Sequence, residues 1–110
     1  MAVSIRKLTL WRTEVEHRPG ALSELLEPLC AAGADLQIVM GYRIPGQKGR
    51  AVVEVAPVGP RKLAQAAERG GLAPGGAPTL LVLGDNRPGL ANRIARALAE
   101  SGVNIAFLVA

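Results

Sequence analysis

Hydrophobic and polar residues alternate in the first part of the chain, and the spacing then switches to three and four residues. Alternation of period two is typical of half-buried strands, whereas spacing of three and four marks one face of a helix. The run 79–83 is apolar after its first residue, as expected for a strand buried on both faces. The elements predicted in this way are strands over 5–14, 36–42, 51–56 and 79–83 and helices over 19–33 and 60–70.

A repeat extends this pattern. Residues 18–20 and residues 87–89 both read Arg-Pro-Gly, 69 positions apart. With the same offset Leu29 falls on Leu98, and a second helix followed by a strand over Val103–Val109 is expected. The chain therefore predicts an α+β fold, ferredoxin-like βαββαβ, with an additional αβ unit that forms an incomplete second repeat.

We expect the first unit to span residues 1–72 and the second, incomplete unit residues 79–110, with the strand 79–84 shared by both. Residues 73–78 are rich in Pro and Gly and read as a linker. An apolar strand at the end of the chain is an aggregation hazard unless it is paired. Either a partner chain covers it or the natural protein is longer, so we predict a homodimer or a higher homo-oligomer.

Local signals refine the predicted elements. Pro19 suits the first position of its helix, where the missing N–H is not needed, and Gly33 suits a left-handed cap at the helix end. Pro28 should kink this helix. Cys30, beside the leucine stripe, is expected to be a buried small hydrophobe, and Trp11 a packing or interface residue.

Composition excludes several classes of protein. The net charge is +4 with a pI near 10.0, but the basic residues are scattered among acidic ones and aromatic residues make up 3%. Nucleic-acid binders cluster their cations and often stack bases on aromatic side chains, so we expect no nucleic-acid partner. No apolar run approaches the roughly 20 residues that span a bilayer, so no membrane partner is expected. One cysteine excludes a disulfide scaffold and suits a cytoplasmic protein.

Two motifs around the second helix carry a resemblance. Residues 85–90 read Asp-Asn-Arg-Pro-Gly-Leu, and residues 102–106 read Gly-Val-Asn-Ile-Ala. With the strand before them and the helix between them, they resemble an ACT domain, most of all the serine-binding regulatory domain of phosphoglycerate dehydrogenase. Residues 17–21 and 33–36 are a weaker version of the same pattern. The whole chain is thus similar to small stand-alone tandem ACT-domain proteins.

The resemblance implies an amino-acid site at a domain interface, lined by the family's loop asparagine and by the asparagine before its second strand. These positions match Asn86 and Asn104. The family's histidine two residues before the loop asparagine matches Gly84, so that contact is missing. The first copy has His17 and Asp35 at the paired positions, so its ligand preference should differ.

Physical chemistry favours the same place. A helix N-terminus attracts a carboxylate, glycine lets a ligand approach the backbone, and an amide can serve both ends of a zwitterion. The second copy keeps both amides and is predicted to be the better site. The candidate ligand-binding residues are Asn86, Gly89, Leu90, Asn104, His17, Gly20, Ala21 and Asp35.

No nucleophile with a base, no paired carboxylates and no metal-ligand spacing can be found in the sequence. We therefore expect a protein that is not an enzyme, without cofactor or metal, that binds an amino acid or similar small molecule and regulates a partner. The alternative is a structural dimerisation or protein-interaction module without a ligand. A third reading, an RNA-binding ferredoxin-like domain, would need strand aromatics that this sequence lacks.

Overall fold

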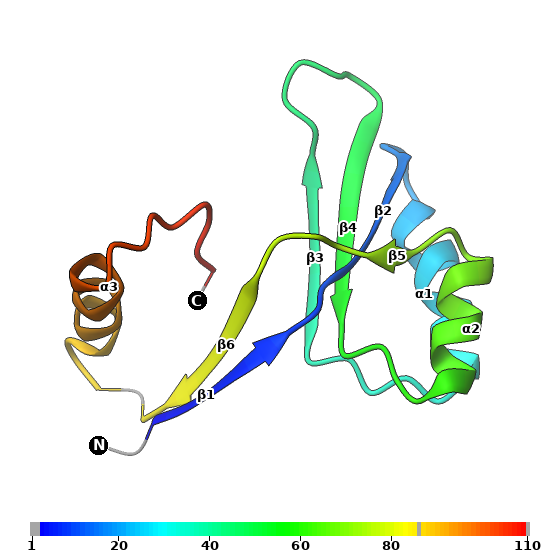
Figure 1. The fold of residues 1–110 in the computed structure, drawn as a ribbon. Helices are drawn as coiled ribbons and strands as arrows, with labels where there is room; N and C mark the ends of the chain where they lie inside the picture. The colour runs from blue at the N-terminus through cyan, green and yellow to red at the C-terminus, as the bar shows by residue number, and fades with distance from the viewer. Residues whose placement is uncertain (1–2, 86, 110) are drawn as a thin grey trace. The chain divides into compact units, whose positions relative to one another are not determined.

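The computed structural model describes residues 3–85 and 87–109 and shows strands and helices in mixed order (Figure 1). Their bounds are β1 Val3–Leu8, β2 Trp11–Glu16, α1 Ala21–Ala31, β3 Ile38–Arg43, β4 Arg50–Ala56, α2 Arg61–Arg69, β5 Ala73–Pro74, β6 Thr79–Gly84 and α3 Leu90–Glu100. Contacts divide the chain into two compact units. One is the continuous segment Lys7–Leu80, which we call the inserted unit; the other joins Met1–Arg6 to Leu81–Ala110, and we call it the split unit.

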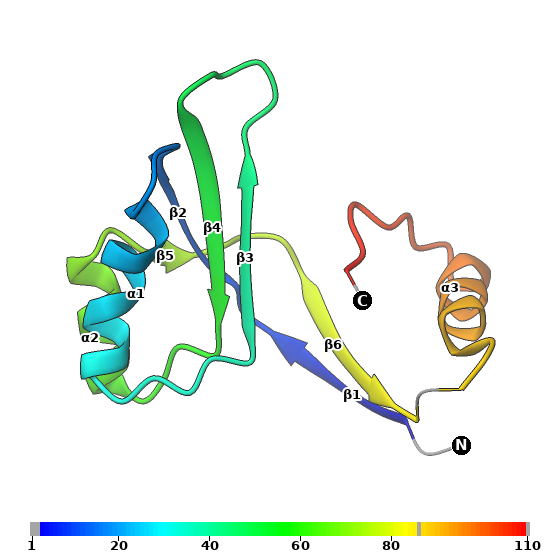
Figure 2. The same ribbon diagram turned by 180° about the vertical axis from the view of Figure 1, so that it is seen from behind.

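The inserted unit has the predicted βαββαβ topology. Its four strands lie in the order β3-β4-β2-β5, and each neighbouring pair is antiparallel. The register sets Trp11 opposite Val55 and Val15 opposite Ala51. Helices α1 and α2 lie on one side of this sheet, as Figures 1 and 2 both show. The predicted fold class is therefore confirmed.

The core of the inserted unit lies between this sheet and its two helices. Val55 of β4 is 0% exposed and Leu29 of α1 is 1% exposed. Trp11, predicted to be a packing residue, belongs to the same buried cluster as Leu63 and Ala67 of α2. Full burial of one aliphatic side chain contributes roughly 1.5–3 kcal/mol, so these few residues hold the helices on the sheet.

The predicted strand 5–14 is two strands. The chain breaks at residues 9–10, where β1 ends and β2 begins, and these two strands join different sheets. The expectation that 79–83 closes the first sheet is also wrong. That place is taken by β5 within the predicted linker, and β6 pairs with β1 instead. The backbone N–H of Gly75 donates to the Leu10 carbonyl at 2.7 Å, and a Cβ at Gly75 would lie 2.9 Å from that oxygen.

The helix boundaries follow glycine conformation. Gly20 is the N-cap of α1 with φ +87°, so Pro19 lies before the cap, and its placement at the first helical position is wrong. Gly33 has φ +87°, which confirms the left-handed end of the helix. Cys30 is exposed, so its predicted burial is wrong: α1 turns Leu29 inward, and the next position faces out.

The split unit holds a two-stranded sheet and one helix. The arrows of β1 and β6 point in opposite directions in Figures 1 and 2, so the pair is antiparallel. No residue of α3 is buried. Residues 103–109, predicted as the last strand, form no strand. In the inserted unit the matching segment becomes β3 by pairing with β4, and the described part of the split unit offers no equivalent of β4.

The two compact units also differ from the predicted division at residues 72 and 79, because their contacts place the first strand with the C-terminal segment. Among the helices described, none has the length and apolar character needed to cross a membrane.

Candidate functional site

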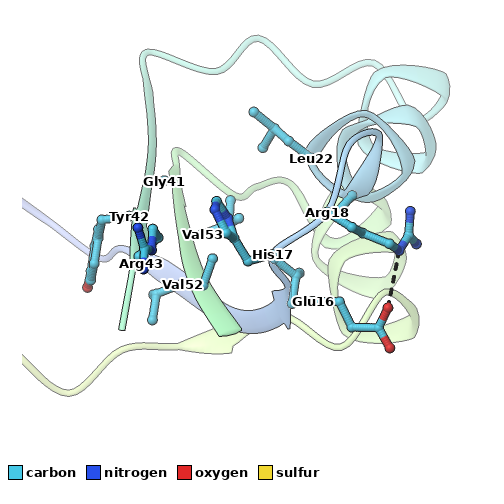
Figure 3. Close-up of a pocket in the computed structure, with 12 residues that line it drawn as sticks. Glu16, His17, Arg18, Leu22, Gly41, Tyr42, Arg43, Val52 and Val53 are labelled. Carbon is cyan, nitrogen blue, oxygen red and sulfur yellow. Dashed lines mark hydrogen bonds and ion pairs between the residues drawn. The ribbon is translucent and has the colours of Figure 1, made fainter. Parts of the chain in front are cut away.

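A hollow of about 260 Å³ opens in the inserted unit where β2 leads into α1. It lies between the start of this helix and the edge strand β3. Figure 3 shows Leu22 of α1 on one side and Tyr42 and Arg43 of β3 on the other. Its lining residues are Val15, Glu16, His17, Arg18, Ala21, Leu22, Gly41, Tyr42, Arg43, Ala51, Val52 and Val53.

Small side chains make room for this hollow. The register sets Gly41 opposite Val53 and Arg43 opposite Ala51, so glycine and alanine stand where larger residues would fill the space. Ala21, the first residue of α1, is also small and is buried. The floor of the hollow is therefore apolar, because Val15 and Val53 lie beneath it.

Arg18 fixes the loop between β2 and α1. Its guanidinium donates from Nε to Glu16 Oε2 at 3.2 Å and from Nη1 to Glu24 Oε1 at 3.1 Å. Hydrogen bonding to Glu24, and then the charge of that carboxylate, raise the pKa of Arg18 above its ordinary value. The same hydrogen bond and charge lower the pKa of Glu24. The positive charge of Arg18 is thus already matched by two carboxylates.

Arg43 is the cation of the hollow whose charge is not matched. Within the described residues its guanidinium makes no hydrogen bond and no ion pair, and it lies at the C-terminal end of β3. The helix α1 has no side-chain cap. The N–H of Ala21 donates to the Arg18 carbonyl at 3.3 Å, so the N–H groups of Leu22 and Ser23 are the ones that need an acceptor from elsewhere. A guanidinium and a helix N-terminus beside an apolar floor can hold a small molecule that carries a carboxylate.

The structure places some of the predicted residues of the first copy at the hollow and one of them away from it. His17 and Ala21 line the hollow, and Gly20 lies between them as the N-cap. The backbone N–H of His17 donates to the Gly49 carbonyl at 2.8 Å, which holds this loop against the β3–β4 connection. Asp35 is exposed and follows the other end of α1, and a helix of 11 residues is about 16 Å long. Within one chain, His17 and Asp35 are therefore not brought together.

The second copy shows the same separation. Gly89 is the N-cap of α3 with φ +89°, and Leu90 is the first helical residue. Asn104 is exposed and follows the far end of α3, whereas Asn86 lies outside the described residues. The predicted preference for this copy as a ligand site stays a prediction.

Gly84, where the sequence resemblance would place a histidine, has little room for a side chain. A Cβ at this position would lie 3.2 Å from Leu90 Cδ2 and 3.5 Å from Val3 Cγ2. The end of β6 is thus packed closely against the start of α3 and of β1, and a histidine would need both side chains to move.

Of the lining residues only His17 and Ala21 were predicted from the sequence, and Gly41, Arg43 and Val53 are among those that were missed. They come from β3 and β4, and only the pairing of these strands brings them to the start of α1. The available signal was a glycine followed two residues later by an arginine at the end of a predicted strand. Among residues 3–85 and 87–109, no three His, Cys, Asp or Glu side chains gather in a way that could hold a metal ion.

Residues 78–110 match the family model of the ACT domain. A search of curated proteins finds no match to the chain. Among solved structures, the chain is similar to the ligand-free regulatory subunit of aspartate kinase from Thermus thermophilus. The TM-score is 0.61 at 15% identity, and the alignment covers 98% of this chain and 80% of that one.

Two further structures are similar over the whole chain. The regulatory subunit of aspartate kinase from Thermus flavus has a TM-score of 0.57 at 13% identity, covering 100% of this chain and 81% of that one. A structure of aspartokinase alpha and beta subunits has a TM-score of 0.55 at 17% identity, covering 100% and 80%. At these identities the likeness establishes the fold, an α+β fold of the ACT type.

Proposed function

We propose that this protein is a regulatory protein without catalytic activity that binds an amino acid in the hollow at the start of α1. The observation that carries the proposal is the unmatched Arg43 guanidinium beside an uncapped helix N-terminus and an apolar floor. The ACT-domain match and the fold shared with aspartate kinase regulatory subunits support a regulatory role.

The lining also indicates the kind of amino acid. The ligand carboxylate is held by Arg43 and by the N–H groups of the first turn of α1. Its side chain rests on Val15, Val53 and Leu22, which favour an aliphatic group over a polar one. Binding then regulates a partner if the ligand has different affinities for two arrangements of an interface.

Thermal unfolding with each standard amino acid tests the proposal. A ligand at 100 times its dissociation constant stabilises the fold by about 2.7 kcal/mol, which is a shift of several degrees. We expect aliphatic amino acids to give the largest rise in melting temperature. Arg43→Gln should weaken binding about tenfold to a hundredfold, because one charge-assisted hydrogen bond is lost.

Arg12→Gln is the matched control. Arg12 and Arg43 lie in the same sheet, but Arg12 is not part of the hollow. The control should bind as the unchanged protein does. The proposal is contradicted if no amino acid raises the melting temperature, or if both substitutions reduce the response equally.

A second candidate function is a structural interaction module that needs no ligand. It is favoured by the exposed apolar side chains of the C-terminal segment, including Ile105, Phe107 and Leu108. Such residues usually mark an interaction surface. This candidate also assumes the predicted homo-oligomer, and it is preferred if the amino-acid panel gives no response while the chain self-associates.

A further inference from the structure

Most of the polar side chains around the hollow have a fixed charge or a partner. The five that line it are Glu16, His17, Arg18, Tyr42 and Arg43. Glu16 and Arg18 pair with each other, with Arg18 Nε 3.2 Å from Glu16 Oε2. The hydroxyl of Tyr42 donates to Glu54 at 3.1 Å. The guanidinium of Arg43 is a permanent cation that can only donate.

The imidazole of His17 is the exception. Within residues 3–85 and 87–109 it makes no hydrogen bond and no ion pair, whereas the backbone N–H of His17 donates to the Gly49 carbonyl at 2.8 Å. Figure 3 shows His17 on the loop between β2 and α1, facing Val53 of β4. The backbone thus holds this residue at the hollow, and the two ring nitrogens are left for a ligand.

Histidine changes its hydrogen-bonding role near neutral pH. A neutral imidazole has one nitrogen that accepts a hydrogen bond, whereas a protonated imidazole has two that donate and none that accepts. The change ordinarily falls between about pH 5 and pH 8, and carboxyl, guanidinium, ammonium and phenol groups ordinarily titrate outside this range. The titratable and charged groups on the elements around His17 are all of these other kinds. They are Glu16 and Arg18 of its own loop, Glu24 of α1, Tyr42 and Arg43 of β3, Lys48 of the β3–β4 connection and Arg50 of β4.

An amino acid in this hollow needs an acceptor for its ammonium group as well as donors for its carboxylate. The backbone carbonyls of Glu16, Arg18 and Pro19 already accept hydrogen bonds within the loop. The Glu16 carboxylate is turned toward Arg18, as the dashed line in Figure 3 marks. The hollow, at about 260 Å³, is smaller than the roughly 300–1,000 Å³ of ordinary ligand pockets, so the α-carbon of a ligand lies close to the loop. The neutral imidazole of His17 is therefore the acceptor best placed for the ammonium group.

We propose that His17 recognises the group beside the ligand carboxylate and thereby determines, through its protonation, which class of ligand binds. The proposal rests on the proposed function, because it assumes that Arg43 holds the carboxylate. When neutral, His17 accepts a hydrogen bond from the ammonium group of an aliphatic amino acid. When protonated, it repels that group and donates instead to the carbonyl oxygen of the α-keto acid with the same side chain. The hollow thus takes aliphatic amino acids above neutral pH and aliphatic α-keto acids in mild acid.

Three ligands with one carbon skeleton test this assignment. They are valine, α-ketoisovalerate and isovalerate, which carries neither an amino nor a keto group, and calorimetric titration at about pH 8 and about pH 5.5 gives their dissociation constants. Relative to isovalerate, valine should bind more weakly in acid and α-ketoisovalerate more tightly. The ratio of the dissociation constant of α-ketoisovalerate to that of valine should fall at least about tenfold from the higher pH to the lower, because a charge-assisted hydrogen bond is exchanged.

Substitutions at His17 should remove this dependence on pH. His17→Asn supplies an amide, which donates and accepts at every pH, and asparagine is the residue at the matching place of the repeat, Asn86. This variant should bind valine with a ligand preference that is the same at both pH values. His17→Lys supplies a permanent cation and should prefer α-ketoisovalerate at both. Glu16→Gln is the matched control, since it alters another polar residue of the same lining, and it should keep the change of preference with pH.

An NMR titration of the unchanged chain gives an independent measurement. The chain has one histidine, so its imidazole signals follow His17 alone. A ligand that prefers one protonation state stabilises that state. Relative to isovalerate, valine should therefore lower the midpoint of the imidazole titration, and α-ketoisovalerate should raise it.

Equal midpoints with valine and α-ketoisovalerate overturn the proposal, and so does a ratio of dissociation constants that is the same at both pH values. Loss of the pH dependence in Glu16→Gln but not in His17→Asn also overturns it, because Glu16 would then be the residue that recognises the ammonium group. The NMR titration decides the matter if a variant does not fold. Failure of all three carboxylates to bind overturns this proposal alone, whereas the proposed function is judged by the thermal response to the full set of amino acids and by Arg43→Gln.

Discussion

Arg18 joins two carboxylates that are eight residues apart, and it thereby shapes the loop between β2 and α1. Glu16 ends the strand and Glu24 lies in the first turn of the helix. An acidic residue in this first turn also complements the positive end of the helix dipole. The wall of the hollow is thus held by charges that are exposed to solvent and sensitive to pH.

The contribution of Glu24 to stability should disappear in acid. Its pKa in the folded protein lies below the ordinary value of 4.5, because Arg18 holds the carboxylate by a hydrogen bond and by charge. A lowered folded pKa gives stability that is present above the unfolded pKa and is lost as the pH falls through the folded one. Glu24→Gln should therefore lower the melting temperature at pH 7 and have no effect once the pH is well below 4.5.

Thermal unfolding followed by circular dichroism at both ends of this range is the measurement. Glu27→Gln is the control, since Glu27 is an exposed residue of the same helix and has no hydrogen-bond or ion-pair partner among the described residues. Equal effects of the two substitutions at pH 7 would contradict a specific role for the Arg18–Glu24 pair.

Residue-scale features with a local cause could be predicted from the sequence. Gly33 ends α1 in a left-handed conformation because glycine there has no Cβ to clash, and this depends on neighbouring residues alone. The exposure of Cys30 could not be predicted, because this residue lies at the margin of the leucine stripe and the sequence pattern does not show whether that margin is buried. Its exposure depends on which face of α1 meets Trp11 and Val53, and that is a tertiary property.

At the scale of elements, α1 and α3 carry the same repeat but have different surroundings. Leu29 of α1 and Leu98 of α3 are 69 positions apart and occupy equivalent places. Leu29 is buried in the core of the inserted unit, whereas Leu98 is half buried. Equal sequence patterns thus give unequal burial, because α1 has α2 and a four-stranded sheet beside it.

Leu29→Ala should destabilise the inserted unit by about 2–5 kcal/mol, because it leaves a cavity in a packed core. Leu98→Ala should leave the same transition nearly unchanged. Urea unfolding followed by tryptophan fluorescence measures this directly, since Trp11 is the one tryptophan of the chain and lies in the core cluster with Leu29. A similar loss for both variants would show that the two units unfold together.

The helices were predictable and the strand pairings were less so. Helical spacing is a property of one segment, and it located α1, α2 and α3 correctly. The end of β1 and the role of β5 depend on which distant strands supply hydrogen bonds, and β5 has two residues, too few for any pattern. The hollow was predicted only in small part for the same reason: His17 and Ala21 belong to a local motif, whereas Arg43 arrives through sheet register.

At the scale of the molecule, the two units should differ in stability. The inserted unit has two helices on a four-stranded sheet and a buried core, whereas the split unit has a two-stranded sheet and a helix without a buried residue. Segments with few buried apolar contacts open at low free-energy cost.

Limited trypsin digestion of dilute protein should therefore cut first in the split unit. We expect early cleavage after Arg96, which is exposed and is not followed by proline, and late cleavage after Arg12 and Arg50, which lie within the four-stranded sheet. Mass spectrometry of a time course identifies the fragments. Early cleavage after Arg50 would show that the inserted unit is the less stable of the two.

The pairing of β1 with β6 has a consequence for how such a chain can evolve. The polypeptide leaves the split unit after Arg6, within β1, and returns to it at Leu81, within β6. Because these strands are hydrogen-bonded neighbours, the exit and the return lie about one strand spacing apart, roughly 4.8 Å. Recombination at two adjacent junctions could exchange the whole segment between them as a cassette. A new binding specificity could then be acquired in one event, with the β1–β6 ladder left as its fixed frame.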